Sequence, residues 1–156
     1  MPVKDEVYRM NICTWDERFI GLAKHISEWS KDPSTKVGAV AVSEDSHQIL
    51  STGWNGFPRK IGDTHDRLLD RNIKYKLTVH AEMNCIYNAT HNGISLNLSR
   101  LYVYGLPVCS SCALGVLQVG VSKVIMRAPV IGDLWKDEWK KSSKLFDEAG
   151  IEYYFI

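Results

Sequence analysis

The sequence predicts an α/β fold, a three-layer α/β/α sandwich whose central sheet is mixed and has five strands. Two strand-like segments near the N-terminus are separated only by a polar turn, which favours an antiparallel hairpin. Three later strand-like segments alternate with helical segments, and crossovers of that kind make the strands parallel. No repeat, low-complexity tract or linker interrupts the 156 residues, so we expect a single domain over residues 1–156.

The first half of the chain contains one helix and the hairpin. A capping-box pattern begins at Thr14, and apolar residues follow at helical spacing until Pro33 stops the pattern. Residues 37–43 and 48–54 have the composition of short strands. The turn formers of residues 55–59 then predict a loop, which leads into a charged segment.

The second half of the chain alternates between helices and strands. Glycines follow three of the helical patterns at the position where a helix usually ends. In order, we expect partial helix over 66–71, then a helix over 79–91, a strand over 101–104, a helix over 109–119, a strand over 121–126, a helix over 134–149 and a strand over 151–156. Ligands bind in such folds at the carboxyl ends of the strands and at helix N-termini.

Composition excludes several classes of function. The 19 Lys and Arg residues nearly balance the 18 Asp and Glu residues, and the net charge of +1 argues against an extended nucleic acid as partner. The apolar runs are far shorter than the roughly 18 residues that span a membrane. Residues 1–10 carry charges where a signal peptide has an apolar core, so we expect a cytoplasmic protein whose cysteines are thiols or metal ligands.

Two short motifs lie at expected helix starts. One contains His80 and Glu82, and the other is a Cys-x-x-Cys motif formed by Cys109 and Cys112. Helix N-termini favour thiolates, and one imidazole with two thiolates is a three-ligand zinc set that leaves a fourth position for water. We therefore predict that His80, Cys109 and Cys112 bind one catalytic zinc ion, with Glu82 as the catalytic acid and base.

The order of these motifs is typical of zinc-dependent nucleobase deaminases. In those enzymes metal-activated water attacks the ring carbon that carries the amino group, and a glutamate transfers the protons. Their motif has a proline directly before the first cysteine, whereas Val108 separates Pro107 from Cys109 in this chain. We expect this departure to affect the wall of the base pocket rather than the zinc ligands.

The same residue types also occur in sites of other kinds and in the protein core. A Cys-x-x-Cys pair also occurs in redox sites and in structural zinc sites, although a structural site needs a fourth protein ligand. Cys85 lies about 140° around the helix from His80, so we expect it in the core. Cys13 has no evident partner, and we expect Trp135 and Trp139 to serve packing or a subunit interface.

Three segments together resemble the deoxycytidylate (dCMP) deaminase family, whose fold is cytidine-deaminase-like. They are residues 32–40 (DPSTKVGAV), 53–59 (GWNGFPR) and 80–84 (HAEMN), and the resemblance covers roughly residues 14–127. It implies hydrolytic deamination of dCMP to dUMP and ammonia, which supplies dUMP for thymidylate synthesis. It also implies a homo-oligomer, commonly a hexamer, and regulation by dCTP and dTTP with Mg²⁺.

The resemblance further implies substrate and effector contacts. Asn55 would contact the sugar or phosphate, and the backbone of Ala81 would meet the pyrimidine carbonyl. Lys36 and Arg59 would lie near substrate or effector phosphate. Two alternatives stay open: a deaminase of another cytosine nucleotide or nucleoside (CMP, dCTP or cytidine), and a non-catalytic nucleotide-binding module stabilised by zinc. One domain leaves no room for a separate regulatory domain, so regulation would use its own loops or subunit contacts.

Overall fold

The structure is a computed structural model in which residues 13–156 are described. Helices and strands alternate along the chain much as the sequence predicts. Their bounds are α2 (Trp15–Ser27), β1 (Gly38–Val42), β2 (Ile49–Trp54), α3 (His65–Leu69), α4 (Arg71–Leu77), α5 (Ala81–His91), β3 (Arg100–Tyr104), α6 (Ser110–Gln118), β4 (Lys123–Arg127), α7 (Asp133–Ala149) and β5 (Glu152–Phe155). Within the described residues, no helix is long and apolar enough to cross a bilayer.

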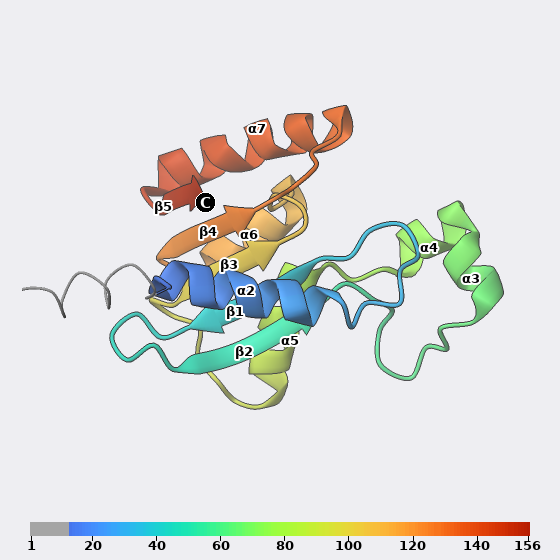
Figure 1. Cartoon of the computed structure of the whole chain (residues 1–156), viewed down its shortest axis with the longest axis horizontal. Helices are drawn as coiled ribbons and strands as arrows, with labels where there is room; N and C mark the ends of the chain where they lie inside the picture. The colour runs from blue at the N-terminus through green and yellow to red at the C-terminus, as the bar shows by residue number, and fades with distance from the viewer. Residues whose placement is uncertain (1–12) are drawn as a thin grey trace, which may run out of the picture.

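The five strands form one mixed sheet in the order β2-β1-β3-β4-β5 (Figure 1). β1 pairs antiparallel with both β2 and β3. β3, β4 and β5 are mutually parallel, because a helix connects each of them to the next. The predicted hairpin and the predicted parallel strands are both confirmed.

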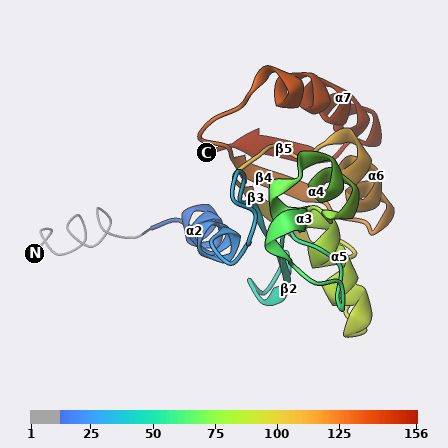
Figure 2. The same cartoon turned by 90° about the vertical axis from the view of Figure 1, so that its right-hand side faces the viewer.

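Helices cover both faces of the sheet, and each face has its own core. Figure 2 shows α2 on one side of the strands and α5 and α6 on the other. Adjacent residues of β3 separate the two cores, since Tyr102 packs with α2 whereas Val103 packs with α5 and α6. Phe146 brings α7 to the same core as Val103. The predicted three-layer sandwich is confirmed.

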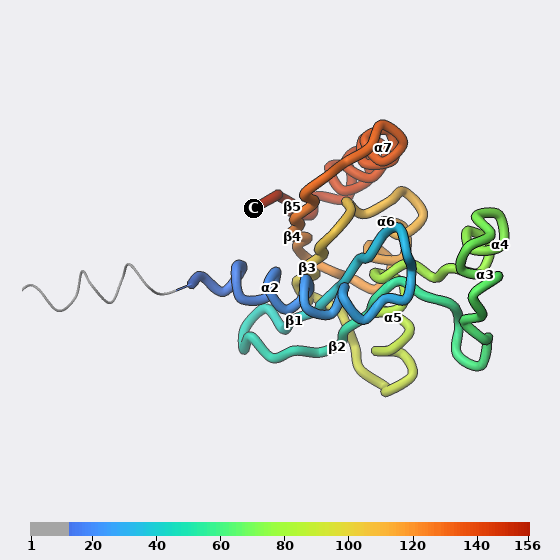
Figure 3. The backbone as a smooth tube through the Cα atoms, turned by 45° about the vertical axis from the view of Figure 1, so that its right-hand side comes forward, coloured from blue at the N-terminus to red at the C-terminus, as the bar shows by residue number. Residues whose placement is uncertain are grey.

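The segment between β2 and α5 is more helical than the sequence indicated. The expected partial helix over 66–71 is two short helices, α3 and α4, that project from the body of the domain (Figure 3). Asp70 ends α3 and caps α4, because its carboxylate accepts hydrogen bonds from the backbone N–H groups of Asn72 and Ile73. An aspartate N-cap satisfies helix donors within the first turn, which allows so short a helix to form.

A shared carboxylate joins α2 to two strands. The Thr14 capping box is present at the start of α2, and Asp16 follows in its first turn. Asp16 accepts hydrogen bonds from the hydroxyls of Tyr102 at 2.8 Å and Tyr154 at 2.6 Å. Tyr102 lies in β3 and Tyr154 in β5, so one side chain ties the outer helix to a central strand and to an edge strand.

We predict that Asp16→Ala lowers the free energy of unfolding by about 2 kcal/mol, because it leaves the buried Tyr102 hydroxyl without its acceptor. Urea denaturation followed by circular dichroism measures the change. Glu28→Ala, at the exposed end of the same helix, is the control and should leave the stability within about 0.5 kcal/mol of the original. Equal stabilities for Asp16→Ala and the control would contradict this role of Asp16.

Candidate active site

The predicted metal ligands lie at the starts of two helices. His80 is the N-cap of α5, and Cys109 is the N-cap of α6. Cys112 is the third residue of α6, and its backbone N–H donates to the Cys109 sulfur at 3.4 Å. Each ligand is therefore placed by the backbone geometry of a helix end, where the positive end of the helix dipole also favours thiolates.

A close approach of backbones sets the position of α5. Gly53 lies in β2, and a Cβ atom at this residue would collide with the backbone of Ala81 and Cys85 in α5. The glycine therefore lets α5 pack directly against the strand. This contact fixes the start of α5, which carries His80.

The three ligand atoms have the spacing of a zinc site. His80 Nδ1 lies 3.4 Å from the sulfur atoms of both Cys109 and Cys112. All three ligand atoms lie within 4.8 Å of one another, and they form the one such metal-ligand group among residues 13–156. Usual zinc–sulfur and zinc–nitrogen bonds in a tetrahedral arrangement put nitrogen and sulfur about 3.5 Å apart. The residues thus fit a zinc ion bound by one imidazole and two thiolates.

Hydrogen bonds among these groups shift their proton affinities in opposite directions. The pKa of Cys109 is lowered, mainly by the hydrogen bond from Cys112 and to a smaller extent by the hydrogen bond from His80. The pKa of Cys112 is raised, because its thiol donates a hydrogen bond to the Cys109 sulfur and because burial disfavours a second thiolate. The pKa of His80 is raised through its hydrogen bond with Cys109. A divalent cation would replace the protons that these groups share.

Glu82 is a buried carboxyl beside the ligands. It lies in the first turn of α5 and is 3% exposed. Burial raises the pKa of Glu82 to about 7, although the neighbouring His80 opposes the shift. A carboxyl with this proton affinity suits general acid and base catalysis near neutral pH.

A cavity of about 110 Å³ opens beside the metal ligands. His80 and Glu82 line it together with residues that lie far apart in the sequence. The remaining lining residues are Asp32, Ser34, Thr35, Val37, Asn55, Lys74, Tyr75, Thr78, Ala81, Leu106, Pro107 and Trp135. A partly apolar cavity that is lined by a metal-ligand histidine and a titratable carboxyl has the features of an active site.

The other predicted contact residues fall into two groups. Asn55 and Ala81 are buried and line the cavity. The Asn55 side chain accepts from the backbone of Val37 and donates to that of Thr35, both at 2.9 Å, so it also holds the wall of the cavity in shape.

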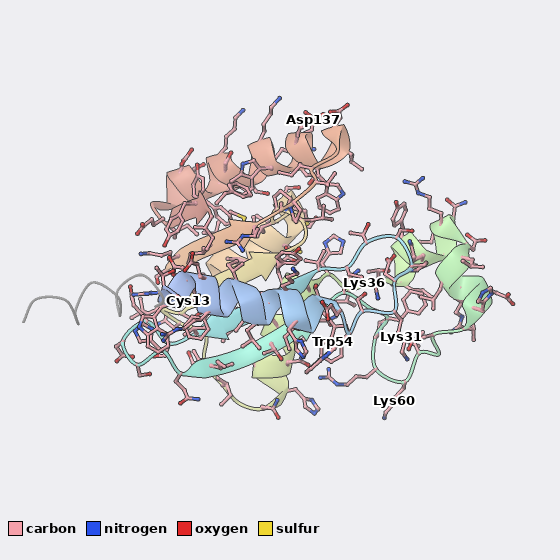
Figure 4. All side chains as sticks on the ribbon, viewed as in Figure 1. Cys13, Lys31, Lys36, Trp54, Lys60 and Asp137 are labelled. Carbon is pink, nitrogen blue, oxygen red and sulfur yellow. The ribbon has the colours of Figure 1, made fainter. Side chains whose placement is uncertain are left out.

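Lys36 and Arg59 lie outside this lining. Lys36, labelled in Figure 4, donates from its Nζ to the carbonyl of Ser30. Arg59 donates to the side chain of Asn88 and borders a second cavity, which is also lined by Trp54, Asn84 and Tyr87. The structure therefore brings two of the four predicted contact residues to the first cavity.

Several lining residues are not among the site residues that the sequence predicts, and Lys74 and Trp135 are two of them. Lys74 of α4 is 6% exposed, and its Nζ contacts Asp32 at 3.1 Å and Ser34 at 3.2 Å. Trp135 of α7 lies beside His80, with 6.1 Å between the ring centroids. The Asp70 N-cap is the sequence signal that would have indicated α4. The position of Trp135 depends on the path of the loop between β4 and α7, which leaves no sequence signal.

The two predicted packing tryptophans of α7 therefore have different surroundings. Trp139 packs against Phe146, Tyr153 and Phe155, as expected of a core-facing aromatic residue. Trp135 also packs against the core, as predicted, but in addition it lines the cavity. Cys85 is fully buried, as predicted, and burial raises its pKa to about 12.

Known proteins resemble this chain over nearly its whole length. The family model of the cytidine and deoxycytidylate deaminase zinc-binding region matches residues 13–128. An uncharacterized deaminase of Aliivibrio fischeri is 37% identical over 147 residues, which cover 93% of this chain and 95% of the relative. A probable deoxycytidylate deaminase of Drosophila melanogaster is 35% identical over 152 residues, which cover 89% of this chain and 70% of the relative.

Solved structures share the fold. The crystal structure of the dCMP deaminase of cyanophage S-TIM5, in complex with dCMP and dUMP, superimposes with a TM-score of 0.71. It is 23% identical and covers 99% of both chains, so this likeness concerns the fold alone. The cytidine-deaminase-like fold expected from the sequence is confirmed. The family model spans most of the chain and includes all of the metal ligands, so the chain belongs to the cytidine and deoxycytidylate deaminase zinc-binding family.

Proposed function

We propose that this protein is a zinc-dependent hydrolase that converts dCMP to dUMP and ammonia. The proposal is carried by one observation: His80, which is grouped with Cys109 and Cys112 as a metal-ligand set, lines the same cavity as the buried Glu82. The deoxycytidylate deaminases among the relatives support dCMP as the substrate. Membership of the zinc-binding family and the spacing of the ligand atoms support zinc as the metal.

Glu82 carries the proton transfers in this mechanism. His80, Cys109 and Cys112 would hold a zinc ion, which would activate water as a nucleophile at neutral pH. The Glu82 carboxylate accepts a proton from the attacking water and delivers it to N3 of the cytosine. It then carries the second proton to the amino nitrogen, which leaves C4 as ammonia while the ring carbonyl of uracil forms.

The start of α5 and the loop beside it would orient the base and sugar. The N–H of Ala81 belongs to the first turn of α5 and has no acceptor within the helix, so it is available to the pyrimidine carbonyl. Asn55 uses one amide hydrogen on the carbonyl of Thr35 and keeps the other for the deoxyribose or its phosphate.

The phosphate of the nucleotide needs a cationic contact. Lys74 is the one lysine among the described residues that line the cavity, and it lies beside Ser34. Lys36 and Arg59, which the resemblance implies for substrate or effector phosphate, border the surrounding loops instead. We therefore assign the substrate phosphate to the neighbourhood of Lys74 and Ser34, and keep Lys36 and Arg59 as proposed effector contacts.

Other properties implied by the resemblance remain proposals. They are a cytoplasmic location, supply of dUMP for thymidylate synthesis, assembly into a homo-oligomer such as a hexamer, and regulation by dCTP and dTTP with Mg²⁺. The second cavity, which Arg59 borders, offers a place for an effector phosphate. Sedimentation analysis with and without each triphosphate tests both the assembly and its response to effectors.

We predict that the zinc-loaded protein releases ammonia from dCMP faster than from CMP, dCTP or deoxycytidine. Phosphate recognition at the cavity should raise kcat/KM for dCMP over that for deoxycytidine by at least about tenfold, the effect of one hydrogen bond to a charged group. A coupled ammonia assay on the four substrates measures the ratio. Equal values for nucleoside and nucleotide would refute phosphate recognition, and nucleotide binding with no turnover would favour a non-catalytic module.

We predict that Glu82→Gln binds zinc as before and loses about 10²- to 10⁴-fold in kcat, because the amide transfers no protons. Ammonia release measures the turnover, and metal analysis of the same sample measures the zinc content. Turnover close to that of the unmodified protein would contradict the assignment of Glu82 as the catalytic acid and base.

We predict that Cys112→Ser retains much less zinc than the unmodified protein, because an alcohol is a far weaker zinc ligand than a thiolate. Metal analysis after dialysis against a chelator measures the loss. Cys13→Ser removes an exposed thiol outside the site and is the matched control. Full zinc content in Cys112→Ser would exclude this sulfur as a ligand.

A further inference from the structure

We infer that helix α7 holds the zinc ligand Cys109 in position from both sides, with Glu138 and Ser142 as the positioning residues. The inference rests on the zinc site of the proposed function and is independent of the identity of the substrate. α7 spans residues 133–149 and lies beyond the region that the family model matches, which ends at residue 128.

Glu138 binds the residue that follows Cys109. One oxygen of its carboxylate accepts a hydrogen bond from the backbone N–H of Ser110 at 3.2 Å and another from the Ser110 hydroxyl at 2.6 Å. Ser110 is the first residue of α6. A carboxylate at this position satisfies a free helix donor and interacts favourably with the positive end of the helix dipole. The two bonds fix the start of the helix on which both thiolates lie.

Ser142 binds the residue that precedes Cys109. Its hydroxyl donates to the backbone carbonyl of Val108 at 2.7 Å, and both residues are fully buried. A buried bond of this kind is costly to break, because the carbonyl would lose its partner without gaining water. The backbone is therefore fixed immediately before Cys109 as well as immediately after it.

The spacing along α7 explains how one helix reaches both sides of the ligand. Glu138 and Ser142 are four residues apart, so they lie one turn apart on the same face of the helix. Trp135 lies on this face one turn earlier, beside the ring of the ligand His80. One face of α7 thus contacts the surroundings of two of the three metal ligands.

The hydrogen bonds from α7 matter more because residue 108 is a valine and not a proline. Related zinc deaminases have a proline directly before the first cysteine, and a proline ring fixes the φ angle of its residue. Val108 has no such restriction. The hydrogen bond from Ser142 and those to Glu138 restrain the same stretch of backbone through tertiary contacts instead.

The test measures how tightly zinc is held. Removing a group that orients a metal ligand typically costs about 10- to 100-fold in metal affinity. We expect Glu138→Ala to release zinc to an excess of chelator about 10- to 100-fold faster than the unmodified protein, and Glu138→Ala/Ser142→Ala to release it faster still. Glu138→Gln retains an acceptor for Ser110 and should restore slow release. The Co²⁺-substituted alanine variants should show altered thiolate–cobalt absorption bands.

Two controls separate positioning from general stability. Asp137 projects from the outer side of α7 (Figure 4), and Asp137→Ala removes the same charge from the neighbouring position. Phe146→Leu weakens the packing of α7 in the core and leaves both hydrogen-bonding side chains, Glu138 and Ser142, in place. Both controls should release zinc at the rate of the unmodified protein, and Phe146→Leu should lower the melting temperature.

The rate of zinc release from Glu138→Ala decides whether α7 positions Cys109. Zinc release from Glu138→Ala within twofold of the unmodified protein would overturn the inference, as would equally fast release from Phe146→Leu. Glu138 is partly exposed, so its alanine variant tests the inference even if the double variant does not fold. If the protein binds zinc and deaminates no cytosine substrate, the proposed function fails while the zinc-release comparison still decides the role of α7.

Discussion

The site depends on one geometric constraint, that the N-termini of α5 and α6 must meet at the same place. His80 and Cys109 are themselves the N-caps of these helices, so neither ligand has a flexible segment with which to compensate for a displaced helix. The close packing of α5 against β2 at Gly53 sets one helix, and the parallel pairing of β3 with β4 sets the other. A shift of either helix by one or two ångströms would separate ligand atoms that now lie within 4.8 Å.

Charge at the cavity is balanced locally. Glu82 and the cysteines concentrate negative charge, and a zinc ion would offset it. Elsewhere in the cavity lining, the buried Lys74 is paired with Asp32, which satisfies both groups where water is scarce. This ion pair is formally neutral, so it adds no net charge to the cavity. The near-zero net charge of the whole chain agrees with this reading.

Elements outside the zinc-binding motifs complete the site. The short helix α4 and its C-cap bring Lys74, Tyr75 and Thr78 to the cavity. α7 brings Trp135 to the cavity and Glu138 to the start of α6. These segments follow or separate the zinc-binding motifs of the sequence, and they supply several of the residues that line the cavity.

The sequence by itself determined the features that depend on local chemistry. The capping box at Thr14, the helix that starts after His80, the Cys-x-x-Cys motif and the order of strands and helices all follow from patterns within a few residues. Only the tertiary structure decided that Lys74 and Trp135 line the cavity, that Lys36 and Arg59 lie outside it, and that Glu138 reaches Ser110. Those contacts join residues that are distant along the chain, and they depend on loop paths and on how helices pack across the sheet. A sequence pattern encodes the periodicity of each element, whereas the meeting of two elements is fixed only when the whole core packs.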